Sequence, residues 1–110
     1  MKLKIKQSEN EVSRDVKNYL SLSGYKCWRV NNGAVFNQKR NTWIYHGEKG
    51  LPDLVCASAK LKVALFVETK SSIGKIRPEQ AEFLELVNKC DKVVGLCIHS
   101  LEELIEGMRK

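Results

Sequence analysis

The sequence predicts an α/β fold in which a mixed central β-sheet is flanked by helices, in the order α-β-β-β-β-α-β-α. Two observations support it: capped helical patterns near both ends and after residue 77, and short apolar runs rich in Val, Ile and Leu between them. The chain has 110 residues, of which 43% are apolar and 29% are charged. This length and composition predict one domain, residues 1–110, with a modest core.

The first helix is expected over residues 9–22. Ser8 is followed three residues later by Glu11, which is the spacing of a capping box at a helix start. Apolar residues recur at helical spacing from Val12 to Leu20, and Gly24 ends the pattern. The residues alone therefore favour Glu11 as a cap, with a role in a functional site as the alternative.

Two strands are expected next, over residues 25–31 and 42–46. The segment between them contains a turn signal, Asn-Gly at 32–33, and then the adjacent cations Lys39 and Arg40. We interpret this segment as a basic loop. It either contacts the phosphate groups of a nucleic acid or is only a solvated turn, and the sequence leaves both interpretations open.

The centre of the chain predicts an antiparallel hairpin over residues 54–67. A turn centred on residues 60–61 pairs positions whose numbers sum to 121, so Asp53 lies opposite Glu68, roughly 5 Å away on the same face. Lys70 lies two residues beyond Glu68 and shares that face. Lys-Leu is not a favoured two-residue turn, so a register shifted by one residue stays an alternative.

The remaining sequence predicts helix, strand and helix. Pro78 suits the first turn of a helix over residues 78–90, a buried strand follows at 92–99, and Ser100 caps a last helix. The connection from the central hairpin through the middle helix is expected to be right-handed, which makes the two strands it joins parallel. Gln80 lies in the first turn of the middle helix, where it is again interpreted first as a cap.

The net charge of +6 and a pI near 9.2 indicate an anionic partner. Nucleic acid is the leading candidate, and a basic surface without a partner is the alternative. No apolar run approaches the ~20 residues of a membrane span, and the N-terminus lacks the apolar core of a signal peptide. The four cysteines are far apart and form no C-x-x-C motif. We therefore expect an intracellular, cytoplasmic protein with reduced thiols and no membrane partner.

Asp53, Glu68 and Lys70 would converge at one end of the predicted hairpin. Two carboxylates this close repel each other unless a hard divalent cation lies between them. Mg²⁺ held there would polarise a phosphodiester and lower the pKa of a bound water, while Lys70 would orient that water or stabilise the transition state. These residues predict hydrolysis of nucleic-acid phosphodiester bonds.

Pro52-Asp53 followed by Glu68-Thr69-Lys70, both in predicted strands, resembles the PD-(D/E)xK nuclease superfamily. Further segments narrow the resemblance to the VRR-NUC family of virus-type replication and repair nucleases. They are S-E-N-E-V from residue 8, V-N-N-G from 30, G-L-P-D-L from 50, V-E-T-K from 67 and P-E-Q-A-E-F-L from 78. The resemblance covers residues 8–104 in the family's order and spacing.

The resemblance implies a restriction-endonuclease-like core and a compact stand-alone nuclease of the type often carried by phages, which would act in the host cytoplasm. It also implies dependence on Mg²⁺ or Mn²⁺. The implied substrate is DNA, in particular branched DNA such as a Holliday junction. The implied assembly is a homodimer, which places two active sites on one junction.

Carried over by position, the resemblance implies a set of site residues and reverses the interpretation of Glu11 and Gln80 as mere caps. Asp53 and Glu68 become the metal ligands, with the backbone carbonyl of Thr69 as an extra ligand. The implied catalytic set is Glu11, Asp53, Glu68, Lys70 and Gln80. The basic residues expected to bind DNA are Lys39, Arg40, Lys49, Lys75 and Arg77. Arg77 stands where the family usually has a small capping residue, so that helix start is either shifted or binds phosphate.

Three alternatives remain beside a structure-selective nuclease. A restriction-type nuclease on the same core usually needs additional recognition segments, for which 110 residues leave little room. A non-catalytic nucleic-acid-binding module would use the basic surface only, and the intact set of Asp53, Glu68 and Lys70 argues against it. A purely structural interpretation makes Asp53 and Lys70 an ion pair.

Overall fold

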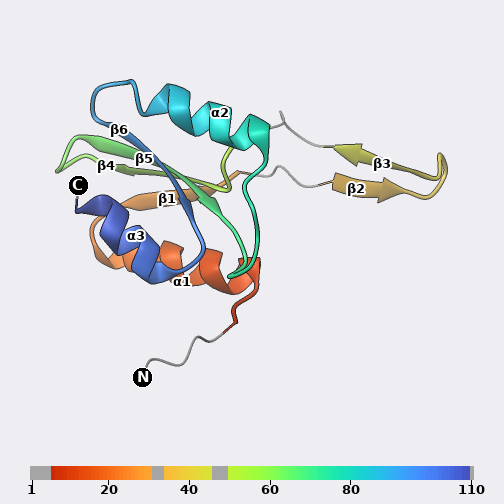
Figure 1. Ribbon diagram of the computed structural model, residues 1–110, viewed down its shortest axis with the longest axis horizontal. Helices are drawn as coiled ribbons and strands as arrows, with labels where there is room; N and C mark the ends of the chain where they lie inside the picture. The colour runs from red at the N-terminus through yellow and green to blue at the C-terminus, as the bar shows by residue number, and fades with distance from the viewer. Residues whose placement is uncertain (1–5, 31–33, 46–49, 110) are drawn as a thin grey trace.

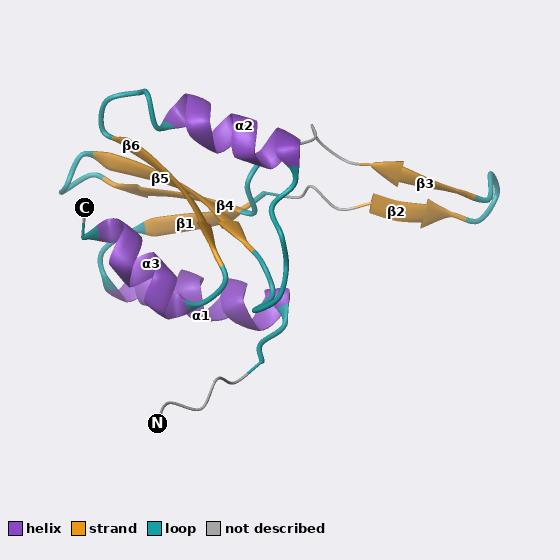
Figure 2. Cartoon of the chain, in the orientation of Figure 1, coloured by secondary structure: helices purple, strands orange, loops and turns teal. Residues whose placement is uncertain are grey.

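The computed structural model describes residues 6–30, 34–45 and 50–109 (Figure 1). Its elements are α1 (Glu9–Leu22), β1 (Lys26–Arg29), β2 (Ala34–Asn37), β3 (Thr42–Tyr45), β4 (Leu54–Ser58), β5 (Val63–Thr69), α2 (Pro78–Val87), β6 (Val93–Ile98) and α3 (Leu101–Met108). Four strands form one sheet in the order β1-β4-β5-β6, in which only β5 and β6 are parallel. The predicted mixed sheet flanked by helices is therefore confirmed (Figure 2).

Helix α1 begins and ends where its capping pattern predicts. The Glu11 N–H donates to the Ser8 hydroxyl at 3.2 Å, and that hydroxyl donates to Glu11 Oε1 at 3.0 Å. Gly24, with φ of 94°, follows the last turn in the left-handed conformation that glycine adopts without strain. Val12, Val16 and Leu20 of the apolar stripe are fully buried.

The predicted register of the central hairpin is confirmed. Leu54 pairs with Val67 and Ser58 with Val63, so opposed residue numbers sum to 121. The connection is a four-residue turn over 59–62 rather than a two-residue turn, and Lys62 takes up the bend with φ of 57°. The Ser58 hydroxyl stabilises this turn by accepting the Leu61 N–H at 3.2 Å.

The core lies between one face of the sheet and helices α1 and α3. Its fully or almost fully buried side chains are Val12, Val16, Leu20, Leu54, Cys56, Leu65, Val67, Ile98 and Leu104. None of the helices among the described residues is long and apolar enough to cross a membrane. The core therefore holds β4 and β5 side by side, which fixes the ends of those strands relative to the start of α1.

Helix α2 covers the opposite face of the sheet, over β5 and β6. Phe83 packs edge-on against Phe66 with ring centroids 5.4 Å apart. A Cβ on Gly95 would lie 2.7 Å from Val87 Cγ2, so the missing side chain lets the helix approach. The helix ends at Val87, three residues earlier than predicted, because the Asn88 amide bonds in both directions with the backbone of Gly95, at 2.7 and 3.0 Å.

The segment interpreted as a basic loop is instead the first half of a separate hairpin. Strands β2 and β3 pair antiparallel, from Ala34 with Tyr45 to Asn37 with Thr42. Residues 34–37, expected as loop, therefore form a strand, so the described residues hold one more strand than predicted, whereas Lys39 and Arg40 lie in a turn. Asn37 Oδ1 accepts the N–H groups of Lys39 and Arg40, which closes the turn. Figure 1 shows this hairpin projecting from the body of the molecule.

Candidate active site

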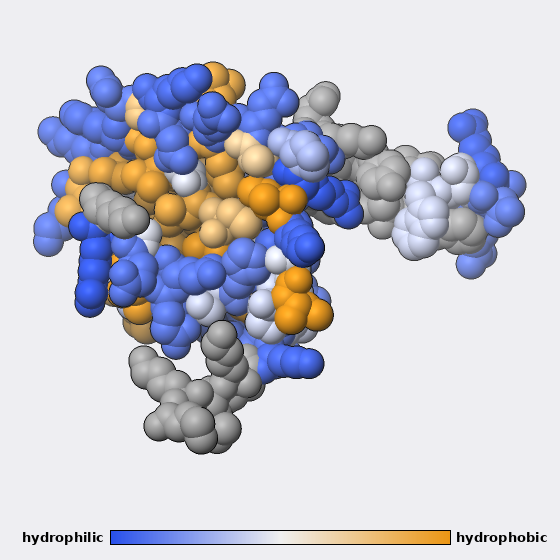
Figure 3. All heavy atoms as spheres, in the orientation of Figure 1, coloured by the Kyte–Doolittle hydropathy of each residue, from blue (hydrophilic) through white to orange (hydrophobic). Residues whose placement is uncertain are grey.

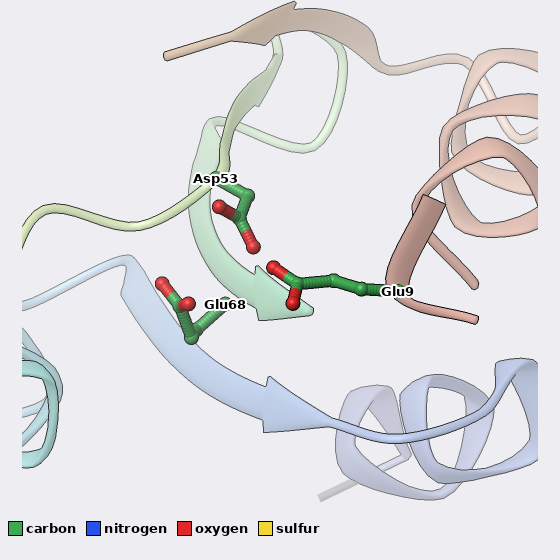
Figure 4. Close-up of side chains that lie close together, drawn as sticks. All are labelled: Glu9, Asp53 and Glu68. Carbon is green, nitrogen blue, oxygen red and sulfur yellow. The ribbon is translucent and has the colours of Figure 1, made fainter. Parts of the chain in front are cut away.

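Three carboxylates from distant parts of the chain converge at the end of the sheet where β4 begins and β5 ends. Glu9 is the first residue of α1, Asp53 directly precedes β4, and Glu68 is the penultimate residue of β5. One carboxylate oxygen from each lies within 4.8 Å of the others (Figure 4). We call these three residues the carboxylate cluster.

Asp53 is held by backbone and side-chain bonds that come from two neighbouring strands. Its carbonyl accepts the Val30 N–H at 2.8 Å, which continues the β1–β4 ladder. Its Oδ2 accepts both the N–H of Thr69 at 3.0 Å and the Thr69 hydroxyl at 2.8 Å. Thr69 therefore orients Asp53, and the predicted role of the Thr69 carbonyl as a metal ligand stays a prediction.

The segment that leads into Asp53 contains Gly50, which lies directly against the start of α2. Gly50 has φ of 94°, and a Cβ there would lie 2.7 Å from the backbone oxygen of Glu79. Any side chain would push the segment away from the helix. Pro52, fully buried, completes the short rigid run that leads into Asp53.

Glu68 is 2% exposed and carries two different oxygens. Its Oε1 accepts the side-chain amide of Gln80 at 2.9 Å and lies 3.3 Å from Lys70 Nζ. Its Oε2 is buried and has no hydrogen-bond partner among the described residues. A buried carboxylate oxygen without a partner is costly, and it marks a position where a cation would bind favourably.

The cluster is electrostatically unfavourable without a cation. Burial, followed by the charge of Asp53, raises the pKa of Glu68 to about 7 even though Lys70 acts in the opposite direction. Burial and Asp53 also raise the pKa of Glu9. Three carboxylates this close together are a hard-oxygen donor set, which suits Mg²⁺ or Mn²⁺. The residues present therefore fit the predicted metal.

Gln80 is both a helix cap and a neighbour of the cluster. Its Oε1 accepts the N–H of Arg77, the residue that precedes α2, at 2.9 Å. Its amide nitrogen then donates to Glu68 Oε1. One side chain thus serves both interpretations, and it ties the start of α2 to the cluster. The helix start is not shifted by Arg77.

Glu11, the helix-borne acid expected from the sequence, lies elsewhere. Its carboxylate accepts the Ser8 hydroxyl in the capping box, and Glu9, two residues earlier, joins Asp53 and Glu68 instead. The physical reason is helical geometry, since residues two positions apart point about 200° apart around the axis. Glu9 stands in the same quoted segment, S-E-N-E-V, and the capping-box spacing identifies which acid the cap uses.

The start of α1 is joined to the segment after Lys70 by two hydrogen bonds, which we call the Gln7–Ser72 pair. The Ser72 N–H donates to the Gln7 carbonyl at 3.1 Å, and the Gln7 N–H donates to the Ser72 hydroxyl at 3.2 Å. On its other side the segment is held by His99, whose Nε2 lies 2.8 Å from the carbonyl oxygen of Gly74. These contacts fix the start of α1, which carries Glu9, relative to the segment that follows Lys70.

The predicted DNA-binding cations lie in two places. Lys75 and Arg77 are exposed on the segment between Lys70 and α2, next to the cluster in sequence. Lys39 and Arg40 are exposed in the turn of the β2–β3 hairpin, away from the cluster. Lys49 lies outside the described residues. The DNA contacts predicted for these residues stay predictions.

Comparison with known protein families gives a result independent of the geometry. Residues 7–99 match the family model described as the VRR-NUC domain. The match spans every residue of the carboxylate cluster as well as Lys70 and Gln80. The comparisons with curated proteins and with solved structures gave no match.

Proposed function

Because the chain belongs to the VRR-NUC family, a family of nucleases, we propose that it is a metal-dependent endonuclease that hydrolyses DNA phosphodiester bonds. The observation that carries the proposal is the Oε2 atom of Glu68, which is buried without a hydrogen-bond partner among the described residues. It lies in a cluster of three carboxylates in which burial and the charge of Asp53 raise the pKa of Glu68 and of Glu9. A bound divalent cation relieves both penalties.

Glu9, Asp53 and Glu68 would hold the metal, and the Thr69 carbonyl is proposed as a further ligand. Bound by these residues, Mg²⁺ or Mn²⁺ would act as a Lewis acid toward the phosphodiester and would lower the pKa of a water at the site. The chain's own contribution is a fixed donor set. Thr69 and Gln80 each hold one carboxylate in place through hydrogen bonds of 2.8 to 3.0 Å.

Lys70 is the proposed catalytic lysine. Its side chain is buried, and its ammonium lies 3.3 Å from Glu68 Oε1. A positive charge at the carboxylate cluster would stabilise the negative charge that develops on the scissile phosphate in the transition state. Because Lys70 also pairs with Glu68, the two side chains hold each other in position.

We propose branched DNA as the substrate class, with the enzyme acting in the cytoplasm, the host's for a phage-borne chain. The net charge of +6 suits a polyanion, and exposed cations lie both beside the cluster and at the distant hairpin turn. Lys49 completes the proposed DNA-binding set. Cations at two separated places suit a substrate with more than one helical arm better than they suit a ligand that makes one short contact.

We further propose that the active species is a homodimer, which supplies two active sites for two strands. Figure 3 shows apolar side chains gathered over β6, between α2 and α3. The half-buried apolar side chains of β6 and α3 include Val94, Leu96, Leu101 and Met108. Asn88 already occupies the backbone groups of Gly95 on this edge, so a second copy would pack on side chains rather than extend the sheet.

The test uses a labelled four-way junction and a linear duplex of the same sequence, each incubated with Mg²⁺, Mn²⁺ or EDTA. We expect metal-dependent cutting of the junction, with paired symmetric nicks from the dimer, and no cutting by Asp53→Ala, the control for contaminating nuclease. Cutting of linear duplex at one sequence would favour a restriction-type enzyme. Salt-sensitive binding of both substrates without cutting would identify a non-catalytic binding module.

A further inference from the structure

Among the described residues, helix α2 covers only one side of the sheet face on which it packs. Trp28 of β1 pairs with Val55, Val55 with Phe66, and Phe66 with Gly95, so these four residues form one row across the sheet. Helix α2 packs on the Phe66 and Gly95 end of the row. Trp28, at the other end, stays 51% exposed.

The uncovered part of this face is a small apolar surface with one cation. Lys26 and Trp28 of β1 and Val55 and Ala57 of β4 point to the same side, because directly paired residues and residues two apart share a face. Lys26 and Ala57 are exposed and Val55 is half-buried. We call these four residues the shelf.

The shelf adjoins the carboxylate cluster. Asp53 directly precedes β4, two residues before Val55, and its carbonyl accepts the N–H of Val30, two residues after Trp28. Strand spacings place the Cα atoms of Trp28 and Asp53 roughly 8 Å apart. A nucleotide whose phosphate lies in the cluster therefore has a neighbouring nucleotide within reach of the indole.

We propose that Trp28 stacks an unpaired base next to the scissile phosphate, with Lys26 contacting the backbone of the same strand. The inference rests on the proposed nuclease function and narrows its branched substrates to those in which a base beside the cut is unpaired or becomes unpaired at the branch point. An exposed indole on a flat sheet face offers a stacking surface to any base that is not paired. The bases of an intact duplex are stacked on each other, so the shelf favours single strands over duplex.

A second copy of the chain is the competing occupant of the shelf. The net charge of +6 disfavours packing this part of one copy against the same part of another, since Lys26 would meet its own counterpart across a two-fold axis. A nucleic-acid strand matches both the cation and the aromatic ring. Because the shelf adjoins the carboxylate cluster, a strand whose phosphate is bound at the cluster would also pass over the shelf.

The chain contains two tryptophans, Trp28 and Trp43, which makes the test direct. Trp43→Phe leaves Trp28 as the sole indole, and Trp28→Phe leaves Trp43. Both proteins are titrated with a short oligothymidylate and with a duplex of the same length, in EDTA so that no cleavage occurs. We expect the single strand to quench Trp28 fluorescence more strongly than the duplex does, with a smaller change at Trp43.

Affinity measured by anisotropy of a labelled strand completes the test. Trp28→Ala should weaken single-strand binding by at least about fivefold and leave duplex binding within about twofold, whereas Leu86→Ala, which removes another exposed apolar side chain, should change neither. Unchanged Trp28 fluorescence at saturation, absence of single-strand binding, or a change in sedimentation of Trp28→Ala without loss of affinity would each overturn the proposal.

The measurements distinguish a failure of the stacking proposal from a failure of the nuclease proposal. Asp53→Ala should keep the Trp28 quenching, because stacking does not depend on the metal ligands. If the wild-type protein cuts DNA and Trp28 does not respond, the stacking proposal is wrong and the nuclease stands. If Trp28 responds and no metal-dependent cutting occurs, the nuclease is wrong and the chain is a single-strand binding module.

Discussion

At the scale of single residues, the hydrogen bonds and the ion pair of the individual carboxylate oxygens define the site. Thr69 supplies two donors to Asp53, and Gln80 and Lys70 share one oxygen of Glu68. The other Glu68 oxygen is left buried without a partner in the described part of the chain. The fold thus contains a destabilising arrangement at the place where a cation would be needed. Such arrangements are typical of functional sites.

The stability of the metal-free protein should depend on the protonation of Glu68. Its pKa is raised from the usual 4.5 to about 7 in the folded protein. The folded state therefore holds this proton more tightly than the unfolded chain does, and the stabilisation disappears as pH rises between those values. We expect the melting temperature in EDTA to fall from pH 4.5 to pH 7, with Glu9 acting in the same direction.

Thermal unfolding at a series of pH values measures this effect. Glu68→Gln, which cannot titrate, should show a much flatter profile over the same range. Added Mn²⁺ should restore stability most at pH values where the carboxylates are deprotonated, because it binds their charged form. A metal-free melting temperature that rises with pH across this range in the wild-type protein would count against the shifted pKa.

At the scale of elements, the site is assembled from the starts of two helices and the ends of two strands. The Gln7–Ser72 pair brings in α1, and Gln80 brings in α2. Gly50 lets the segment before β4 lie against the first turn of α2. The packing of α1, β4 and β5 in the core therefore sets the geometry of the carboxylate cluster.

Gly50 offers a prediction with a matched control, Gly24, since both have φ of 94°. Alanine at Gly24 meets nothing within 4 Å and should cost only the left-handed strain, about 1–2 kcal/mol. Alanine at Gly50 has the same strain and also meets the Glu79 backbone, so it should be more destabilising and should displace Asp53. Chemical denaturation measures the first effect.

Metal affinity separates the two variants further. Titration calorimetry with Mn²⁺ should show weaker binding for Gly50→Ala and an unchanged affinity for Gly24→Ala, since Gly24 lies at the far end of α1 from Glu9. Equal losses of stability and equal metal affinities in the two variants would mean that the approach of Gly50 to α2 does not position Asp53.

At the scale of the whole molecule, positive charge is distributed between the body and the projecting hairpin. The longest dimension of the chain is 47 Å, and the hairpin turn with Lys39 and Arg40 lies at one end of it. A DNA ligand that engages both the cluster and this turn must span much of the molecule. Affinity for branched DNA should therefore depend on the hairpin cations.

Replacing Lys39 and Arg40 together with alanine should weaken junction binding and reduce the slope of log K against log salt by up to about 2, roughly 0.9 for each phosphate that is no longer neutralised. Fluorescence anisotropy over a salt series in EDTA measures the slope. Alanine at Lys60 and Lys89, which are exposed in loops at the other end of the sheet, is the control and should leave the slope unchanged. A slope that both double variants lower equally would show that only overall charge matters.

Much of the fold and part of the site could be predicted from the sequence, because the signals are local. Capping chemistry predicted α1, and the strand pairing confirms the sum-121 register from which Asp53 and Glu68 were expected to lie together. Their carboxylates do lie together in the cluster. The VRR-NUC resemblance is confirmed by the family match. The β2 strand was missed because its four residues precede a run of polar and charged residues that resembles a loop.

The identity of the helix-borne acid could not be obtained from spacing along the chain alone. Glu9 and Glu11 both lie in the first turn of α1, and only the packing of α1 against the sheet decides which one reaches Asp53. Gln80 shows the converse, since a cap and a site contact proved compatible in one side chain. The exposed face of Trp28 likewise follows from where α2 lies, which no local pattern reveals.

The central claim is that Glu9, Asp53 and Glu68 form the metal-dependent catalytic centre. The most direct test compares Glu9→Gln with Glu11→Gln for cleavage of a four-way junction in Mn²⁺. Glutamine serves the capping box as well as glutamate does, so Glu11→Gln should keep both fold and activity. Glu9→Gln should lose at least about tenfold in rate, the scale seen even for residues that only orient a metal ligand. Full activity of Glu9→Gln with loss in Glu11→Gln would contradict the claim.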